Sequence, residues 1–251
     1  MNLFRILIHG LYRLGNHLLA SKCLLCGCSL NGDLLCPGCL GDLPWLEHLP
    51  YSCRQCALAL ASPADLCGHC LKQPPAFSQS LIPFTYDYPL TPLIYRFKYR
   101  RKLAYGKLLG QLLTRHIADC AITRKDWRRP DLLIPSPMHW TRRWQRGFNQ
   151  AEILSQYLSQ TLGIASHSKL VEHRQRTQVQ KTLTRRERQK NLRNAFYLSP
   201  KAKTQIQGKR IALVDDVVTT TATMRELSRL LIKAGAREVQ VWALARTMNR
   251  R

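Results

Sequence analysis

The sequence predicts an α/β protein in which helices flank a parallel sheet, preceded by a small cysteine-rich module. After residue 80, short apolar runs alternate with helical patterns, as is typical of a parallel sheet covered on both faces. Eight cysteines form C-x2-C pairs before residue 75. Residues 1–75 hold five basic and four acidic residues, against 34 and 11 in residues 76–251, and Pro74 and Pro75 interrupt regular structure. We therefore expect a domain boundary near residue 75.

The first 23 residues are mildly amphipathic. Leucines recur at helical spacing, whereas arginines and histidines interrupt the apolar stretch and no small-residue cleavage site follows. We therefore expect a short helix rather than a signal peptide. No run of 18 apolar residues occurs in the sequence, so we expect no membrane span and a cytoplasmic location.

The paired cysteines form two matched sets. Their offset is 30 or 31 residues, which indicates an internal repeat. Four sulfurs in two C-x2-C knuckles suit a closed, tetrahedral structural zinc site. The sequence predicts two such zinc ions, with pairing across the sets left open as an alternative to pairing within them. The ligands are Cys23, Cys26, Cys36 and Cys39 in the first set and Cys53, Cys56, Cys67 and Cys70 in the second.

Two other readings of the cysteines are weaker. A disulfide framework is typical of secreted proteins, and we expect no signal peptide here. A redox role would require fewer C-x2-C pairs than the four in this sequence. Cys28 and Cys120 are left over: Cys28 could replace a neighbouring ligand, although the symmetry argues against it, and Cys120 is expected to pack as a small apolar residue. Zinc of this kind folds segments that lack a core, so the module is expected to be structural.

The first elements of the α/β domain follow from apolar patterns. Residues 80–90 have strand character, and residues 91–122 carry leucines at helical spacing. Residues 131–138 predict a short apolar strand that ends in prolines. Residues 149–163 predict a helix with Asn149 as N-cap, an acidic residue three positions later, and a glycine at the end.

The last three elements predict a strand–helix–strand unit. Residues 210–216 form a buried apolar strand, residues 221–235 a helix closed by Gly235, and residues 238–246 a final strand. In such sheets, ligands bind beyond the carboxyl ends of the strands. The end of the strand at 210–216 is therefore the first place to look for a site.

Two carboxylates meet a hydroxyl-rich turn at that strand end. A helix N-terminus offers unpaired N–H groups and a positive dipole, which predicts a phosphate site, and the adjacent carboxylates can bind a diol or contribute to a Mg²⁺ shell. Together they predict binding of a 5-phosphorylated ribose. The alternative is a threonine N-cap beside aspartates on an exposed turn. The residues are Asp215, Asp216, Thr219, Thr220, Thr221, Ala222 and Thr223.

Several segments carry a resemblance to known families. LVDDVVTTTAT resembles the phosphoribosyl pyrophosphate loop of type I phosphoribosyltransferases. The eight knuckle cysteines, LIYRFKYRRKLAYGKLLGQLL, IPSPMHWTRRWQRGFNQAEIL and RQRTQVQKTLTRRERQKNLRNAF are similar, in that order, to segments of the ComF family of competence proteins, which includes GntX-like proteins. The resemblance extends from about Cys23 to Arg246 and covers most of the chain.

The resemblance implies a double zinc ribbon followed by a phosphoribosyltransferase-like domain. It implies that Asp215 and Asp216 meet the ribose hydroxyls and that residues 219–223 meet the 5-phosphate. The loop after LLIP would face pyrophosphate, with Arg143 and Arg146 as anion contacts, and the alternative for both arginines is a solvated basic face. The family also implies DNA uptake and a competence helicase as partner.

Two departures bear on catalysis. A glycine usually stands in the transferase loop where this chain has Thr221, and a β-branched residue with a positive φ is a backbone outlier. We expect either a differently bent loop or weaker phosphate binding. Some relatives place a catalytic aspartate at the position of Thr219, which cannot act as a base at neutral pH. Because other transferases have threonine there, turnover is not excluded.

The basic charge points to a nucleic acid. The chain carries a net charge of +24, which a polyanion would relieve. Basic residues interleaved with Phe97 and Tyr99 could follow a single strand and stack on its bases, although core packing is the simpler role for each aromatic residue. The candidate contacts are Lys98, Arg100, Arg101, Arg174, Arg176, Lys181, Arg185, Arg186 and Arg188.

Two functions follow as hypotheses. The first is a DNA-uptake factor that binds single-stranded DNA in the cytoplasm on a transferase-like scaffold with a ribose-phosphate site. The alternative is an active phosphoribosyltransferase that uses phosphoribosyl pyrophosphate and Mg²⁺ with an unknown acceptor.

Overall fold

The computed structural model describes residues 21–100, 103–174 and 195–248, apart from the side chains of Arg100 and Leu103. The helix predicted at the N-terminus therefore lies outside the described residues. The same holds for six predicted nucleic-acid contacts, Arg101, Arg176, Lys181, Arg185, Arg186 and Arg188. Within the described ranges, no helix combines the length and the apolar character needed to cross a membrane.

The two cysteine sets share a local geometry. Cys36 and Cys67 are each the N-cap of a five-residue helix, and each Sγ accepts a hydrogen bond from the N–H three residues later. The internal repeat in the sequence is thus a repeat of structure at these two knuckles. The elements of this segment are β1 (Ser21–Lys22), β2 (Ser29–Leu30), α2 (Pro37–Gly41), the 3-10 helix η1 (Leu46–His48) and α3 (Gly68–Lys72).

A parallel sheet forms the centre of the molecule. The strand order is β3-β10-β9-β5-β6, and β4 pairs with the end of β10. Every pairing in this sheet is parallel, as the alternation of strands and helices predicted. The strands are β3 (Ser80–Leu81), β4 (Phe84–Thr85), β5 (Leu132–Pro135), β6 (Ala165–Ser166), β9 (Arg210–Val218) and β10 (Glu238–Arg246).

The helices differ from the predicted pattern in three ways. The segment 91–122, which has a helical pattern, is occupied by α4 and α5, α6 forms where a loop was expected, and α9 was not predicted. The predicted cap of α7 is confirmed, because the Asn149 side chain accepts from the Ala151 N–H and Gly163 adopts a left-handed φ of 64°. The helices are α4 (Leu90–Arg100), α5 (Leu103–Thr123), α6 (Trp140–Arg146), α7 (Gln150–Leu162), α9 (Ala202–Ile206) and α10 (Ala222–Lys233).

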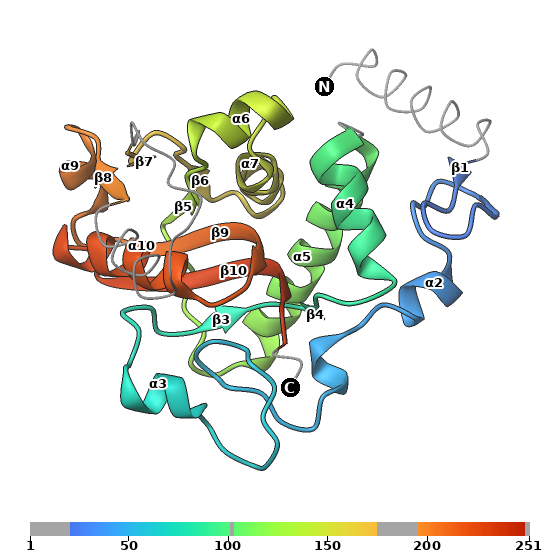
Figure 1. Ribbon diagram of the computed structural model, residues 1–251, viewed down its shortest axis with the longest axis horizontal. Helices are drawn as coiled ribbons and strands as arrows, with labels where there is room; N and C mark the ends of the chain where they lie inside the picture. Colours follow the sequence, from blue (N-terminus) through green and yellow to red (C-terminus); the bar gives the residue numbers. More distant parts are fainter. Residues whose placement is uncertain (1–20, 101–102, 175–194, 249–251) are drawn as a thin grey trace, which may run out of the picture.

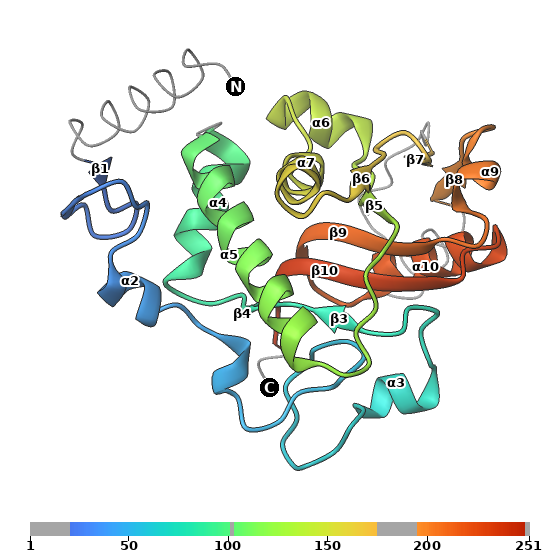
Figure 2. The same ribbon diagram turned by 180° about the vertical axis from the view of Figure 1, so that it is seen from behind.

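Helices cover the sheet on both faces because its strands are apolar on both sides. Ala212 and Val214 of β9 pack with α4, α5 and α7, whereas Ile211 and Leu213 pack with α10. Figures 1 and 2 show the sheet between these two layers. A small antiparallel hairpin of β7 (Val171–His173) and β8 (Phe196–Leu198) joins the α10 layer.

The two cysteine sets lie on opposite faces of the sheet. Cys23 of the first set packs in the α4–α5–α7 layer. All four cysteines of the second set pack in the α10 layer, together with Phe77 and core residues of β9 and β10. The predicted boundary at residue 75 stays a prediction.

The connections place a topological switch between β5 and β9. From β5 the chain passes through α7 to β6 on one side, and from β9 it passes through α10 to β10 on the other. The loops that leave β5 and β9 therefore diverge at the carboxyl end of the sheet. Crevices for ligands form at such points in parallel sheets.

Candidate functional site

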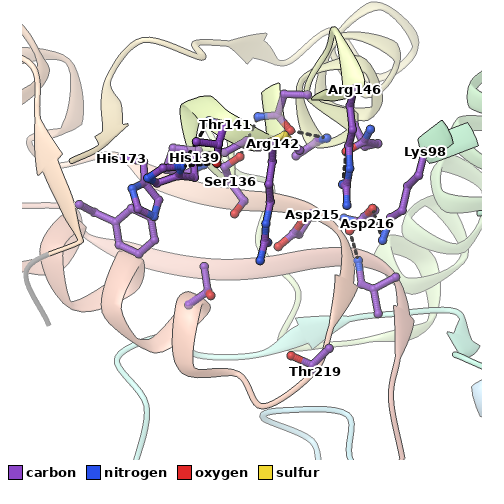
Figure 3. A pocket seen from close by; sticks show the side chains of 18 of the residues that line it. Lys98, Ser136, His139, Thr141, Arg142, Arg146, His173, Asp215, Asp216 and Thr219 are labelled. Carbon is purple, nitrogen blue, oxygen red and sulfur yellow. Dashed lines mark hydrogen bonds and ion pairs between the residues drawn. The ribbon is translucent and has the colours of Figure 1, made fainter. Parts of the chain in front are cut away.

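A cavity of about 680 Å³ lies at the carboxyl ends of β5 and β9. Ser136 lines it from the loop after β5, Asp215 and Asp216 line it from β9, and Lys98 reaches it from α4. Figure 3 shows these side chains around a common space, with Arg142 and Arg146 entering from α6. The cavity thus occupies the switch point of the sheet.

The two aspartates differ in their partners. Asp216 forms an ion pair with Lys98, with 2.8 Å between Oδ2 and Nζ, and both side chains are mostly buried. The Asp215 carboxylate accepts a hydrogen bond from the Asp216 N–H at 2.8 Å. Lys98, a predicted nucleic-acid contact, lines the cavity beside Asp216, and its contact with nucleic acid stays a prediction.

The environment of Asp215 favours its protonated form. The pKa of this carboxyl is raised to about 7, first because burial disfavours the charged state and second because the charge of Asp216 opposes it. The ammonium of Lys98 and a hydrogen bond with Ser136 lower the pKa in turn. The charge of this acidic group therefore changes near neutral pH.

The threonine-rich loop keeps a left-handed turn without glycine. Thr221 is the N-cap of α10 with a φ of 61° and a ψ of −3°, and its side chain is buried. The loop is therefore not bent differently at this position but keeps the left-handed turn with a β-branched residue, a backbone outlier, and the alternative expectation of weaker phosphate binding stays a prediction. The Thr221 hydroxyl accepts a hydrogen bond from Arg225 at 3.1 Å. Thr219 and Thr223 line the cavity.

Helix α6 brings two of its three arginines to the cavity. Arg142 and Arg146 are among the lining residues. Arg143 instead forms an ion pair with Glu152 of α7, with a 2.7 Å contact. Arg143 and Arg146 were the predicted anion contacts and Arg142 was not, because a segment expected to be a loop gives no helical turn by which to separate these side chains.

The motif GFNQ holds the β5 loop against α7. Asn149 Nδ2 donates to the Ser136 carbonyl at 2.9 Å. Gln150 is buried, lines the cavity, and accepts a hydrogen bond from Arg146 at 3.0 Å. Its Nε2 is one of two buried side-chain nitrogens without a hydrogen-bond partner among the described residues. Gln150 is therefore a further site residue that sequence analysis missed.

An aromatic–arginine surface adjoins the cavity on α4 and α6. We give this name to Tyr95, Tyr99, Trp140, Trp144 and Arg146. The two tyrosines stack at 4.9 Å between ring centroids, and the Arg146 guanidinium lies 5.1 Å from the Tyr99 ring. All four aromatic side chains are more than half exposed, with Trp144 at 83%.

Two further residues from the sequence analysis lie elsewhere. Phe97 is buried in the core with only 1% of its surface exposed, so the simpler role of core packing is confirmed for it. Arg174 is exposed on the β7–β8 hairpin, 6.0 Å from the Tyr197 ring.

The sulfurs of the second cysteine set form a closed cluster. Cys53, Cys56, Cys67 and Cys70 are buried, and their four Sγ atoms lie within 4.8 Å of one another. A tetrahedral site with Zn–S bonds of about 2.3 Å requires S···S distances of about 3.8 Å, and the Cys56 and Cys67 sulfurs are 3.6 Å apart. The cluster can therefore hold a metal ion of this geometry with no open position.

The first set contains a fifth sulfur. Cys23, Cys26, Cys28 and Cys36 form the group whose sulfurs lie within 4.8 Å of one another. The Cys39 N–H donates to Cys36 Sγ at 3.4 Å, and hydrogen bonding with the Cys36 thiol raises the pKa of the Cys39 thiol. Cys28 was not among the predicted ligands, because the symmetry of the two sets argued against it, but its sulfur lies in this cluster. The four sulfurs of each cluster come from a single cysteine set. All ten cysteines are free thiols.

Comparisons with known proteins agree with this architecture. Residues 145–251 match the family model described as phosphoribosyl transferase domain. Competence protein F of Haemophilus influenzae is 39% identical over 229 residues, covering 90% of this chain and 96% of that protein. DNA utilization protein YhgH of Salmonella typhimurium is 37% identical over 196 residues, covering 78% and 84%. The purine phosphoribosyltransferase structure from Pyrococcus horikoshii Ot3 has a TM-score of 0.33 at 19% identity and covers 55% of this chain and 70% of that one.

The similarity to Competence protein F covers 90% of the chain and so includes both the cysteine-rich segment and the α/β domain. The parallel sheet with its switch-point cavity is a phosphoribosyltransferase-like fold, and the cysteine clusters are compatible with a zinc-ribbon module before it. The sequence identity to Competence protein F is 39% and extends over nearly the whole of both proteins. The chain therefore belongs to the ComF family of competence proteins.

Proposed function

We propose that the cavity binds the ribose 5-phosphate part of phosphoribosyl pyrophosphate or a related sugar phosphate. One observation carries the proposal: a carboxylate pair and the N-terminus of α10 open onto the same cavity. Asp215 and Asp216 would accept hydrogen bonds from the ribose hydroxyls. The N–H groups at the start of α10, with the hydroxyls of Thr219 and Thr223, would hold the 5-phosphate.

The proposal includes a second anion position on the α6 side of the cavity. Arg142 and Arg146 line that wall, so we assign the pyrophosphate contacts to them and leave Arg143 to its ion pair with Glu152. Mg²⁺ would accompany the pyrophosphate, because phosphate and carboxylate oxygens are the ligands it prefers.

We also propose that each cysteine cluster holds a zinc ion with a structural role. Each cluster brings four sulfurs together, which fills the coordination of a tetrahedral zinc ion and leaves no position for a substrate, and the second cluster is also buried. The elements around these clusters are short and have little apolar core of their own, which is where structural zinc contributes to folding.

We further propose that the protein binds single-stranded DNA in the cytoplasm during DNA uptake. The aromatic–arginine surface supports this proposal, because exposed rings can stack on bases of any sequence while arginines contact the phosphates. Two relatives are named for competence and for DNA utilization. A competence helicase is the partner that this role would require for handling the strand.

A single titration tests both ligands. Labelled single-stranded DNA is bound to the protein, and phosphoribosyl pyrophosphate with Mg²⁺ is then added. Because Arg146 belongs to both the cavity and the aromatic–arginine surface, we expect the two ligands to weaken each other's binding. Binding of both ligands without competition would separate the sites, and absence of DNA binding would contradict the DNA proposal outright.

An active phosphoribosyltransferase is the second candidate. The observation in its favour is that the loop retains the left-handed turn at Thr221 that glycine usually provides. Turnover would release pyrophosphate from phosphoribosyl pyrophosphate in the presence of Mg²⁺ and a nucleobase. The double variant Asp215→Asn/Asp216→Asn should abolish this release. No release with any base of a panel would reject the enzymatic function and leave the binding proposal standing.

A further inference from the structure

Two arginines connect the second cysteine cluster to the phosphate loop. We call residues 218–221 the phosphate loop here, because they lead into the N-terminus of α10. The second cluster lies on the α10 face of the sheet, and its four cysteines share a core with Val218 and Met224. Arg225 and Arg246 each form hydrogen bonds both with the second cluster or its knuckle and with the phosphate loop.

Arg225 is in the first turn of α10 and uses all three guanidinium nitrogens. Nε donates to the Thr221 hydroxyl at 3.1 Å, Nη1 donates to the Gln73 carbonyl at 2.5 Å, and Nη2 donates to the Cys70 sulfur at 3.5 Å. The Arg225 guanidinium thus joins Cys70 of the second cluster, Gln73 just after α3, and Thr221 of the phosphate loop.

Arg246 makes the second connection from the end of β10. This side chain is buried, and Nε donates to the Cys56 carbonyl at 3.0 Å. Nη1 donates to the carbonyls of Val218, at 3.2 Å, and Thr219. The carbonyls at the start of the phosphate loop are therefore held from the knuckle that contains Cys56.

We infer that Arg225 and Arg246 position the phosphate loop from the second cysteine cluster, so that a metal ion in this cluster sets the geometry of the ligand site. The inference rests on the proposed ribose-phosphate site. Thr221 needs such support, because a β-branched residue at a φ of 61° persists only when its surroundings hold it there. The planar fork of arginine suits this role, since it fixes three partners in one orientation.

The first cluster provides a matched comparison. Arg96 donates to the Leu24 carbonyl at 3.3 Å and to the Tyr105 hydroxyl at 3.0 Å. This arginine joins the first cluster to α5 on the opposite face of the sheet, away from α10. The coupling should therefore be specific to the second cluster and to Arg225.

Coupling between two sites is reciprocal. If the cluster holds the loop, a ligand on the loop must in turn stabilise metal in the cluster. The test uses full-length protein that carries Cys26→Ser and Cys36→Ser in every sample, so that three sulfurs remain in the first set, and that is loaded with one zinc ion. The equilibrium partition of zinc between the second cluster and a chromogenic chelator is measured with and without saturating ribose 5-phosphate, whose binding is measured separately by calorimetry.

We expect ribose 5-phosphate to raise the zinc affinity of the second cluster roughly tenfold, within the usual range of coupling between sites. Arg225→Met should reduce the effect to less than about twofold, and Arg96→Met should leave it intact. Thr221→Val removes only the hydroxyl that accepts from Arg225 and should also reduce the effect of ribose 5-phosphate on zinc binding. This second variant tests the same contact if Arg225→Met fails to fold.

Two outcomes contradict the inference in distinguishable ways. If ribose 5-phosphate binds and the zinc affinity of the second cluster is unchanged, or if Arg225→Met and Thr221→Val keep the full effect, the coupling is wrong and the binding site stands. If calorimetry detects no binding to the wild-type cavity, the proposed ribose-phosphate site is itself wrong, and the coupling to it is rejected with it.

Discussion

Asp215 is the residue at which the electrostatics of the site are most unusual. Its pKa is raised to about 7 by burial and by the charge of Asp216. The ordinary pKa of an aspartate is 3.8, so the folded state holds the proton more tightly than the unfolded chain does. This group stabilises the fold fully below about pH 4, and its contribution to the free energy of unfolding is lost as the pH rises towards 7.

The same titration predicts how ligand binding depends on pH. A carboxylate that accepts hydrogen bonds from ribose hydroxyls must be ionised, so affinity for ribose 5-phosphate should rise roughly tenfold between pH 6 and pH 8. Calorimetry at the two pH values measures this. Asp215→Asn should remove most of the dependence, and a flat wild-type profile would contradict the role of Asp215.

Lys98 provides an independent check on that assignment. Its ammonium lowers the pKa of Asp215. Lys98→Met should therefore shift the pH profile of ligand binding towards higher pH, while Lys98→Arg, which keeps the charge, should shift it less. A profile that does not move in Lys98→Met would show that another group controls the pH dependence.

At the scale of elements, α6 links the cavity to the molecular surface. Trp140 and Trp144 lie one turn apart, so they share a face of the helix. Arg142 and Arg146 of the same helix line the cavity. A short helix thus contributes both rings for base stacking and charges for phosphate contacts.

The helix-level prediction concerns Trp144. Trp144→Ala should weaken binding of a single-stranded oligonucleotide, because one base–aromatic stack contributes about 1–3 kcal/mol. That energy corresponds to roughly 5- to 150-fold in the dissociation constant, measured by fluorescence anisotropy. Tyr51→Ala is the matched control, since Tyr51 is an exposed aromatic residue outside this surface. Equal losses in both variants, or none in Trp144→Ala, would exclude α6 as the stacking element.

A second element-level prediction concerns the contact between α5 and α7. A Cβ added at Gly110 would lie 2.6 Å from the Tyr157 ring, so glycine allows the two helices to approach closely. Gly110→Ala should lower the free energy of unfolding by about 1–3 kcal/mol through overpacking. Denaturant unfolding measures this. Gly41→Ala, whose Cβ would meet no atom within 4 Å, should show no such loss, and a stable Gly110→Ala would contradict the close contact.

At the scale of the whole molecule, the most prominent property is the net charge of +24. Such a charge repels itself in the compact state and attracts polyanions. The described arginines of α6 bring part of this charge to the cavity and to the aromatic–arginine surface. The charge therefore supports both proposed ligands, a sugar phosphate and a DNA strand.

Salt dependence tests the DNA proposal at this scale. Each phosphate neutralised on a single strand contributes about −0.7 to the slope of log affinity against log salt. With about five contacts, the slope is about −3.5, so affinity should fall roughly 100-fold between 50 and 200 mM salt. Titrations at several salt concentrations give the slope directly. A slope near zero would mean that the charge does not contact a phosphate backbone.

Much of the fold follows from local patterns. The apolar runs of β9 and β10, the caps of α7 and the C-x2-C repeat are determined by residues close in sequence, and the structure contains each of them. The position of Asp215 and Asp216 near the carboxyl end of a strand also follows from the apolar run before them, although β9 continues past them to Val218.

The sequence by itself determined the α/β class, the two cysteine sets and the carboxylate pair beside a threonine-rich turn. Only the tertiary structure decided that Lys98 enters the cavity and that Arg142 does so in place of Arg143. It also decided that Arg225 and Arg246 join the second cluster to the phosphate loop. These contacts join residues up to 190 positions apart, and their partners are set by how helices and loops pack on the sheet, which local periodicity does not encode.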